Sequence, residues 1–119
     1  EEFDPVPEIL TGIQVAGRPV AVHESQFYLG PPGSGAPMHY HNTAVNVLAY
    51  GRKRWFLHPP GEARYSARPA MEWLQDEYVQ GEPRECVQEA GDIFFVPALW
   101  AHAVVNIETS IGVAYEFNF

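Results

Sequence analysis

The chain has 119 residues, with fifteen acidic and seven basic side chains and a formal net charge of −8. An acidic chain without a basic stripe is unsuited to nucleic acid, and a hydrophobic content of 46% argues against global disorder. We therefore expect one folded domain over residues 1–119 with no nucleic acid among its partners. Because the chain begins at Glu1 and not at a methionine, we interpret it as a piece of a longer protein.

Cysteine usage and charge spacing exclude two further classes of protein. The single Cys86 excludes an internal disulfide framework and a multi-thiolate zinc site. It favours a reducing compartment, the cytoplasm or the nucleus. The longest stretch without an acidic or basic residue, 25–51, contains Pro31, Pro32 and Pro37, so we expect a soluble protein without a membrane span.

Prolines and glycines divide the first half of the chain into short segments. Residues 3–9 are acidic and interrupted by proline, which indicates a lead-in segment and not a core strand. Strand-forming residues predict short strands at 18–23, 26–29 and 45–50, with a turn over 30–35. Gly51-Arg52 predicts a tight turn that returns the chain as a hairpin strand over 53–58.

The second half contains one predicted helix, over residues 70–78, in an insert at 62–84. Met71, Leu74 and Tyr78 share one face of this helix. Further strands are predicted at 85–88, 93–96, 102–107 and 111–117. Many short strands with one short helix favour an all-β fold, either a β-sandwich or a jelly-roll barrel of the double-stranded β-helix kind.

The histidines give the first chemical signal. We interpret His23 and His58 as structural residues. His39 and His41 are two residues apart, so on an extended strand both rings point to one side of the sheet. Two imidazoles on one face can chelate iron, zinc, copper or nickel. A pair of this kind also occurs without a metal, so the spacing leaves both interpretations open.

A second block of sequence mirrors the first. Gly91-Asp92 leads through a strand to His102 and Asn106, much as Gly33 leads to the His39–His41 pair. The two blocks resemble the two sequence motifs of the cupin superfamily. The resemblance implies that His102 meets the other two histidines inside the barrel mouth. Three neutral imidazoles would leave coordination positions open, as in a catalytic metal site.

Three stretches narrow the resemblance to JmjC domains, and within them to the small hydroxylase-like branch. They are residues 27–40, which end in His39-Tyr40, 46–60 with the sequence Gly-Arg-Lys-Arg-Trp-Phe-Leu, and 91–111 with Gly-Asp-Ile-Phe-Phe-Val-Pro. The resemblance implies an Fe(II)- and 2-oxoglutarate-dependent dioxygenase, with another divalent metal as an option. It also implies that the insert borders the mouth of the site.

The resemblance assigns the metal ligands position by position. His39 is the first ligand and His102 the last, whereas His41 stands where the family has a carboxylate. An imidazole at that position removes one negative charge from the ligand set and predicts an altered, three-histidine site.

The resemblance also assigns a cofactor site. Lys53 matches the lysine that pairs with the far carboxylate of 2-oxoglutarate, and a dianion does need a fixed cation. A solvent-exposed hairpin lysine is the alternative. Asn46, placed on a strand facing Lys53, and Asn106 match polar pocket positions, and Tyr28 joins them if its ring points inward.

Two alanines reduce the number of hydrogen-bond donors in the predicted 2-oxoglutarate site. Ala36 and Ala114 stand where hydroxyl residues often support the cofactor, and neither can donate a hydrogen bond. We expect Trp100, two residues before His102, to contact substrate. The remaining aromatic residues of this set, Trp55, Trp73, Phe94 and Phe95, are expected to pack the barrel.

Three functional hypotheses follow. The first is a JmjC-type oxygenase that hydroxylates a protein side chain or a small molecule. The second is a catalytically inactive JmjC-like binding module. The third is a three-histidine cupin dioxygenase that does not use 2-oxoglutarate. A homodimer stays open under all three.

Overall fold

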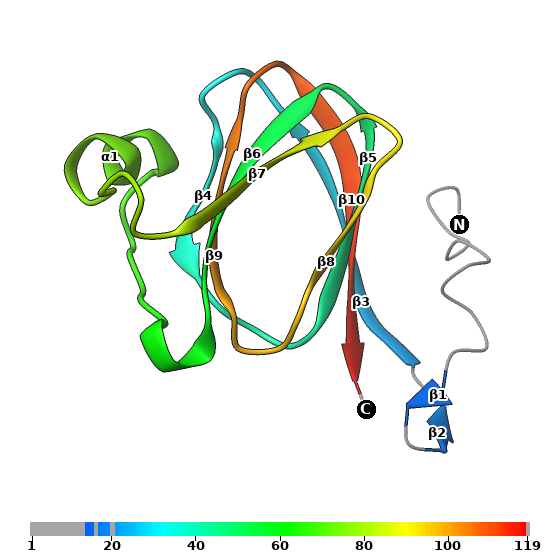
Figure 1. The fold of residues 1–119 in the computed structure, drawn as a ribbon. Helices are drawn as coiled ribbons and strands as arrows, with labels where there is room; N and C mark the ends of the chain where they lie inside the picture. The colour runs from blue at the N-terminus through cyan, green and yellow to red at the C-terminus, as the bar shows by residue number, and fades with distance from the viewer. Residues whose placement is uncertain (1–13, 16, 20, 119) are drawn as a thin grey trace.

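A computed structural model describes residues 14–15, 17–19 and 21–118 of the chain, so the predicted lead-in segment 3–9 lies outside the described residues. Two four-stranded antiparallel sheets face each other (Figure 1). The first has the strand order β3 (Ala21–Gly30), β10 (Ser110–Asn118), β5 (Ala44–Tyr50), β8 (Ile93–Val96). The second has the order β4 (Gly35–His39), β9 (Ala101–Asn106), β6 (Arg52–His58), β7 (Arg84–Glu89). A hairpin of β1 (Gln14–Val15) and β2 (Arg18–Pro19) precedes them, and the predicted all-β jelly-roll barrel is confirmed.

The predicted hairpin at Gly51 is wrong. Strand β5 pairs with β10 and β8, whereas β6 pairs with β7 and β9. The chain therefore crosses from one sheet to the other at this turn, and Asn46 and Lys53 face each other across the barrel, not along a ladder. Gly51 has a φ of +93°, and a Cβ there would lie 2.3 Å from the carbonyl oxygen of Thr109. Only glycine fits this crossing.

The insert between β6 and β7 contains a short 3-10 turn, η2 (Pro60–Glu62), and one helix, α1 (Ala70–Asp76). The helix lies outside the barrel against β4 and β9 (Figure 1). Its inner face consists of Ala70, Trp73 and the half-buried Leu74. Met71, predicted on that face, is 38% exposed. No helix in the described part of the chain is long and apolar enough to cross a membrane.

Strand β9 is buried along both of its faces. Its outward side chains pack beneath α1 beside Met38 and Phe56. Its inward side chains, His102, Val104 and Asn106, line the space between the sheets. The alternation of a strand therefore places a hydrophobic core on one side of β9 and a functional surface on the other.

The buried side chain of Gln88 on β7 joins the two sheets. Its Oε1 accepts a hydrogen bond from Nε1 of Trp55 at 2.9 Å. Its Nε2 donates to the carbonyl oxygen of Asn46, on β5, at 2.9 Å and to that of Asp92 at 3.1 Å. Both amide hydrogens are thus used, and the amide holds β6, β7 and β5 in one arrangement.

We expect Gln88→Leu to lower the free energy of unfolding by about 2–4 kcal/mol, because it leaves the buried Trp55 N–H and two carbonyl oxygens without this partner. Urea denaturation measures the change. Val87→Ala, on the exposed face of the same strand, is the control and should change stability by less than about 0.5 kcal/mol. A Gln88→Leu loss no larger than that of the control would contradict the role of this amide.

Candidate metal centre and cofactor cavity

A cavity of about 500 Å³ lies between the sheets. Residues of every barrel strand except β7 line it, together with His41 and Ser34 from the connecting loops. None of the described residues of the insert 62–84 belongs to this lining, in contrast to the expectation that the insert borders the site. The insert instead supports the site from behind, through the packing of α1 on the outer face of β9.

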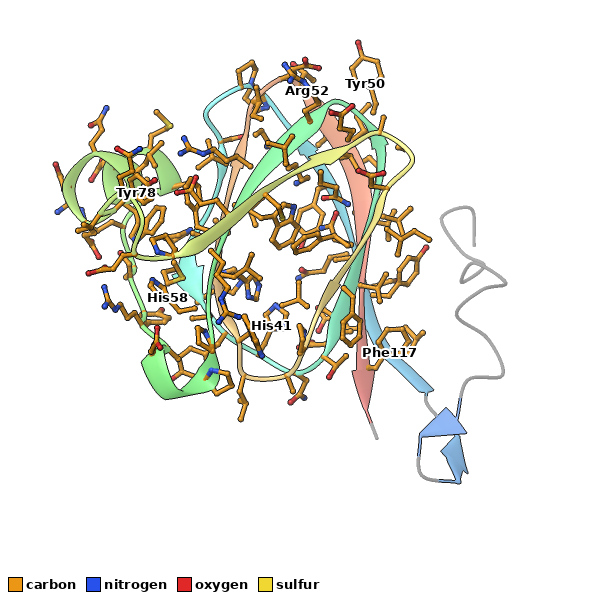
Figure 2. The ribbon with its side chains drawn as sticks, in the orientation of Figure 1. His41, Tyr50, Arg52, His58, Tyr78 and Phe117 are labelled. Carbon is orange, nitrogen blue, oxygen red and sulfur yellow. The ribbon has the colours of Figure 1, made fainter. Side chains whose placement is uncertain are left out.

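The three predicted histidine ligands meet at one end of the cavity. The ring centroids of His39 and His102 are 4.2 Å apart, those of His41 and His102 are 4.7 Å apart, and those of His39 and His41 are 5.4 Å apart. His39 and His102 are register partners on β4 and β9. Strand β4 ends at His39 and His41 lies in the loop beyond it, so the two rings converge without sharing the single extended strand on which their spacing was considered. Figure 2 shows His41 inside the barrel, toward the end opposite Tyr50 and Arg52.

Backbone carbonyl oxygens fix the orientation of all three rings. The Nδ1 atoms of His39 and His102 lie 2.7 and 3.0 Å from the carbonyl oxygen two residues earlier. The Nδ1 of His41 lies 2.7 Å from the carbonyl oxygen of the next residue. A carbonyl can only accept, so each Nδ1 carries the hydrogen and each Nε2 presents a lone pair. The Nε2 atoms of His41 and His102 are 3.1 Å apart, and the cluster's ligand nitrogens all lie within 4.8 Å of one another.

This donor set fits a divalent transition-metal ion. Three lone pairs that converge on one point repel one another, and a cation between them removes that repulsion. Neutral imidazole suits iron, zinc and copper. Metal-bound histidines usually donate their second N–H to a carbonyl or carboxylate, as these rings do. Three ligands on one side leave the remaining coordination positions open to the cavity.

Burial keeps the imidazoles of His39 and His102 neutral, the form that binds metal. Burial, and after it the neighbouring His39, lower the pKa of His102 to about 3. Burial also lowers the pKa of His39. The Nε2 lone pairs of His39 and His102 therefore stay available below neutral pH.

The same shift predicts a pH dependence of stability in the metal-free protein. The unfolded chain takes up a proton at His102 near pH 6.5, whereas the folded chain does so only near pH 3. The stabilisation is complete above pH 6.5 and is lost as the pH falls from 6.5 toward 3, by at most about 1.4 kcal/mol per pH unit. Urea denaturation with a chelator present at each pH measures it. His102→Asn should show a flatter profile over this range, and identical profiles would contradict the assignment.

The other end of the cavity holds a buried cation. Lys53 pairs with Asn106 on β9, four residues along that strand from His102. It is 5% exposed, so the alternative of an exposed hairpin lysine is wrong. Its Nζ lies 5.0 Å from the centroid of the Tyr28 ring, and in the described part of the chain no carboxylate lies within 4.0 Å of it. Burial lowers the pKa of this ammonium, and an anion in the cavity would offset that effect.

Polar groups surround the lysine end. The Tyr28 ring lines the cavity, as its predicted role requires. Burial, and then Glu24 and Glu116, raise the pKa of this phenol, so it remains a hydrogen-bond donor. The buried Oδ1 atoms of Asn46 and Asn106 have no hydrogen-bond partner in the part of the protein that the structure describes. Orphaned acceptors of this kind indicate a place for water or for a polar ligand.

The two alanines that limit the predicted cofactor site, Ala36 and Ala114, both line the cavity. Ser34 also lines it, and its hydroxyl accepts a hydrogen bond from Nδ2 of Asn106 at 2.9 Å. Gly30 leaves room for this contact, because a Cβ there would lie 2.5 Å from the Ser34 Oγ. A hydroxyl group is therefore present, although it is not at the positions that the sequence indicates.

The aromatic residues divide differently from the expectation. The Trp100 side chain is outside the cavity lining and lies 5.2 Å from the guanidinium of Arg84. Its carbonyl oxygen accepts the Nδ1 hydrogen of His102. Trp55 lines the cavity and stacks on Phe94 at 4.2 Å, so it is more than packing. Phe95 is 58% exposed, and the expectation that it packs the barrel is wrong.

His58, interpreted as structural, lies apart from the metal cluster. It is 3% exposed and lines a second cavity of about 160 Å³ beneath the insert. Its Nδ1 has no hydrogen-bond partner in the described structure. The side chain of His23 lies outside the described residues.

The sequence analysis missed an acidic pair at the histidine end. Glu24 on β3 and Glu116 on β10 are register partners, and both line the cavity. An Oε2 of Glu116 lies 3.4 Å from Nδ1 of His41. The signal was available, because strand alternation places Glu24 on the same face of β3 as the predicted Tyr28.

Comparison with known proteins identifies the family. Residues 8–119 match the family model described as the JmjC domain. The chain belongs to the JmjC domain family. It is 35% identical over 94 residues to the human JmjC domain-containing protein 8, covering 74% of this chain and 36% of that protein. It is 34% identical over 116 residues to the chicken 2-oxoglutarate and iron-dependent oxygenase JMJD4, covering 82% of this chain and 27% of that protein.

A solved structure agrees with the fold. The ribosomal oxygenase YcfD from Escherichia coli, in complex with cobalt and 2-oxoglutarate, matches with a TM-score of 0.60 at 18% identity. The match covers 82% of this chain and 24% of YcfD, and at this identity the likeness concerns the fold alone. The chain spans about a third or less of the length of these curated relatives.

Proposed function

We propose that this JmjC domain is an Fe(II)- and 2-oxoglutarate-dependent oxygenase domain that hydroxylates a protein side chain. The observation that carries the proposal is the polarity of the cavity. Three Nε2 lone pairs converge at one end, and at the other end lies a buried ammonium that has no carboxylate partner among the described residues. His102, at the metal end, and Asn106, the register partner of Lys53, are four residues apart on β9, which is roughly 13 Å along an extended chain. A short dicarboxylate with a chelating 2-oxo acid at one end matches that chemistry.

Each residue then has a role toward the bound groups. His39, His41 and His102 hold the metal through Nε2. Lys53 neutralises the far carboxylate of 2-oxoglutarate. The Tyr28 hydroxyl donates to Oε1 of Gln26 at 3.1 Å in this structure, so it would have to turn from Gln26 to donate to that carboxylate. When bound, the iron supplies the chemistry with dioxygen, by which one oxygen atom enters the substrate C–H bond and the other enters succinate as carbon dioxide leaves.

Asn46 and Asn106 contribute the remaining polar contacts of this proposed site. An amide presents either its oxygen or its NH₂ group after a flip, so Asn46 can donate to a carboxylate or accept from a bound water. Asn106 is tied to Ser34 and keeps its free oxygen inside the cavity. These contacts stand in for the hydroxyl groups that Ala36 and Ala114 lack.

The names of relatives support a protein side chain as the substrate. Two plant relatives, each 30% identical, are named an arginine-specific and a lysine-specific demethylase, and YcfD is named a ribosomal oxygenase. A small-molecule substrate is the alternative. Contact of Trp100 with substrate stays a prediction.

One other function has a specific observation in its favour, a three-histidine dioxygenase that does not use 2-oxoglutarate. The cluster that could hold the metal contains imidazoles and no carboxylate ligand. Ala36 and Ala114, which line the middle of the cavity, offer no donor to a cofactor. This alternative gives Lys53 no role, so the lysine separates the two proposals.

The test is an anaerobic titration of the Fe(II)-loaded protein with 2-oxoglutarate, followed by the visible charge-transfer band of the chelate. We expect a band in the wild-type protein. In Lys53→Met we expect 2-oxoglutarate to bind about 10- to 100-fold more weakly, because one charge-assisted contact is lost. Arg52→Met is the matched control, since Arg52 pairs with Glu108 on the surface, and it should bind as the wild type does.

The other outcomes are distinct. Tight Fe(II) binding with no band at any 2-oxoglutarate concentration would contradict the proposal and favour the three-histidine dioxygenase. If the protein does not bind Fe(II), both the 2-oxoglutarate-dependent oxygenase and the three-histidine dioxygenase are contradicted, and the hypothesis that remains is a JmjC-like binding module. A band that is equally strong in wild type and Lys53→Met would show that 2-oxoglutarate binds but that Lys53 takes no part in binding it.

A further inference from the structure

We propose that Glu116 is a positioning residue that holds His41 in its metal-binding orientation and supplies the negative charge beside the metal centre. The inference rests on the proposed function only in requiring that the three histidines bind a divalent ion. It concerns a residue outside the two histidine motifs, on the last strand of the barrel.

His41 has the least support from regular structure among the three histidines. His39 belongs to β4 and His102 to β9, whereas His41 lies in the loop that follows β4. Its side chain is 34% exposed. The carbonyl oxygen that fixes its Nδ1 is that of Asn42, in the same loop, so this hydrogen bond does not fasten the ring to a sheet.

The backbone of this loop is fastened at two points. The carbonyl oxygen of His41 accepts a hydrogen bond from the N–H of Leu99 at 2.9 Å, and the carbonyl oxygen of Thr43 accepts one from the N–H of Phe117 at 2.9 Å. Leu99 adopts a φ of +66°, which is unusual for a non-glycine residue. The second contact brings the end of β10 against the loop.

Glu116 lies beside the imidazole itself, whose Nδ1 hydrogen goes to the carbonyl oxygen of Asn42. It lies on β10 between Ala44 of β5 and Glu24 of β3, so its backbone is held on both sides. Its Oε2 lies 3.4 Å from Nδ1 of His41, on the side of the ring away from the Nε2 that faces His102. Its side chain is 24% exposed, and a partly buried carboxylate is screened less than a surface one. A carboxylate placed on the N–H side of a ligating imidazole orients the ring and makes its Nε2 a stronger donor.

The charge of the cavity favours the same role. A divalent ion held by three neutral imidazoles keeps its full positive charge, and Lys53 adds another at the far end. In the described lining, Glu24 and Glu116 are the acidic side chains that can balance these charges. Two carboxylates in register on adjacent strands repel each other unless a cation lies nearby. Of the two, Glu116 is the one with a contact to the cluster.

The experiment measures metal affinity and ligand geometry without turnover. Metal is removed with a chelator, and Co(II) is titrated back into wild type, Glu116→Gln and Glu24→Gln while the visible ligand-field spectrum is recorded. Glutamine keeps the size of the side chain and removes the charge. We expect Glu116→Gln to weaken Co(II) binding about 10- to 100-fold and to shift the ligand-field bands. Glu24→Gln, the matched control on the partner strand, should stay close to the wild type.

A rescue variant and a folding control complete the design. Glu116→Asp keeps the charge and should recover part of the lost affinity, which a purely structural role of the longer side chain would not. The urea unfolding midpoint of each metal-free variant, compared with the wild type, shows whether an affinity change reflects misfolding. If Glu116→Gln is misfolded, the Co(II) affinity of Glu116→Asp against Glu24→Asp becomes the deciding comparison.

Three results would overturn the inference. Unchanged affinity and spectrum in Glu116→Gln would show that the carboxylate has no part in the site. Equal weakening in Glu24→Gln would show that only the general negative field matters, not the contact with His41. Absence of Co(II) binding in the wild-type protein would remove the proposed function itself, an outcome distinguishable from the other two because the parent protein fails.

Discussion

The burial of β9 on both faces is the constraint on which the rest of the structure depends. A strand with apolar side chains on its outer face needs a cover, and the insert with α1 provides it. The inner face is then free to present His102 at one end and Asn106 at the other, with Val104 between them. Removal of the cover would expose the core and loosen the strand that contributes to both ends of the cavity.

The same division explains the arrangement of the polar groups. Polar atoms inside a barrel must be satisfied by one another, by water or by a ligand. Gln88 satisfies Trp55 and the backbone of β5, and carbonyl oxygens satisfy the three Nδ1 atoms. Some polar groups have no such partner within the described protein: the two asparagine oxygens, the Lys53 ammonium and the three Nε2 lone pairs. The one contact among them is between the Nε2 atoms of His41 and His102, which are 3.1 Å apart. The unsatisfied groups thus outline the proposed metal and cofactor.

Local patterns in the sequence predicted much of this arrangement. The spacing of His39 and His41, the second histidine block and the alternation within strands all act over a few residues, and the cavity brings together the predicted histidines, Lys53, Asn46, Asn106 and Tyr28. The Gly51 hairpin failed because two strands joined by a short turn can enter different sheets, a choice made by distant partners on β9 and β10. Gln88 and Glu116 escaped notice for the same reason. Trp55, the partner of Gln88, is 33 positions away in the sequence, and His41, the partner of Glu116, is 75 positions away. No local pattern marks either pair.

The central claim is that three imidazoles hold one divalent ion through Nε2. X-ray absorption spectroscopy at the zinc edge of the Zn(II)-loaded protein tests it most directly. The account predicts one zinc per chain, nitrogen or oxygen scatterers at about 2.0–2.1 Å and outer-shell scattering from three imidazole rings. Replacement of His41 by alanine should reduce the imidazole count to two. A wild-type spectrum with one imidazole or none would contradict the account.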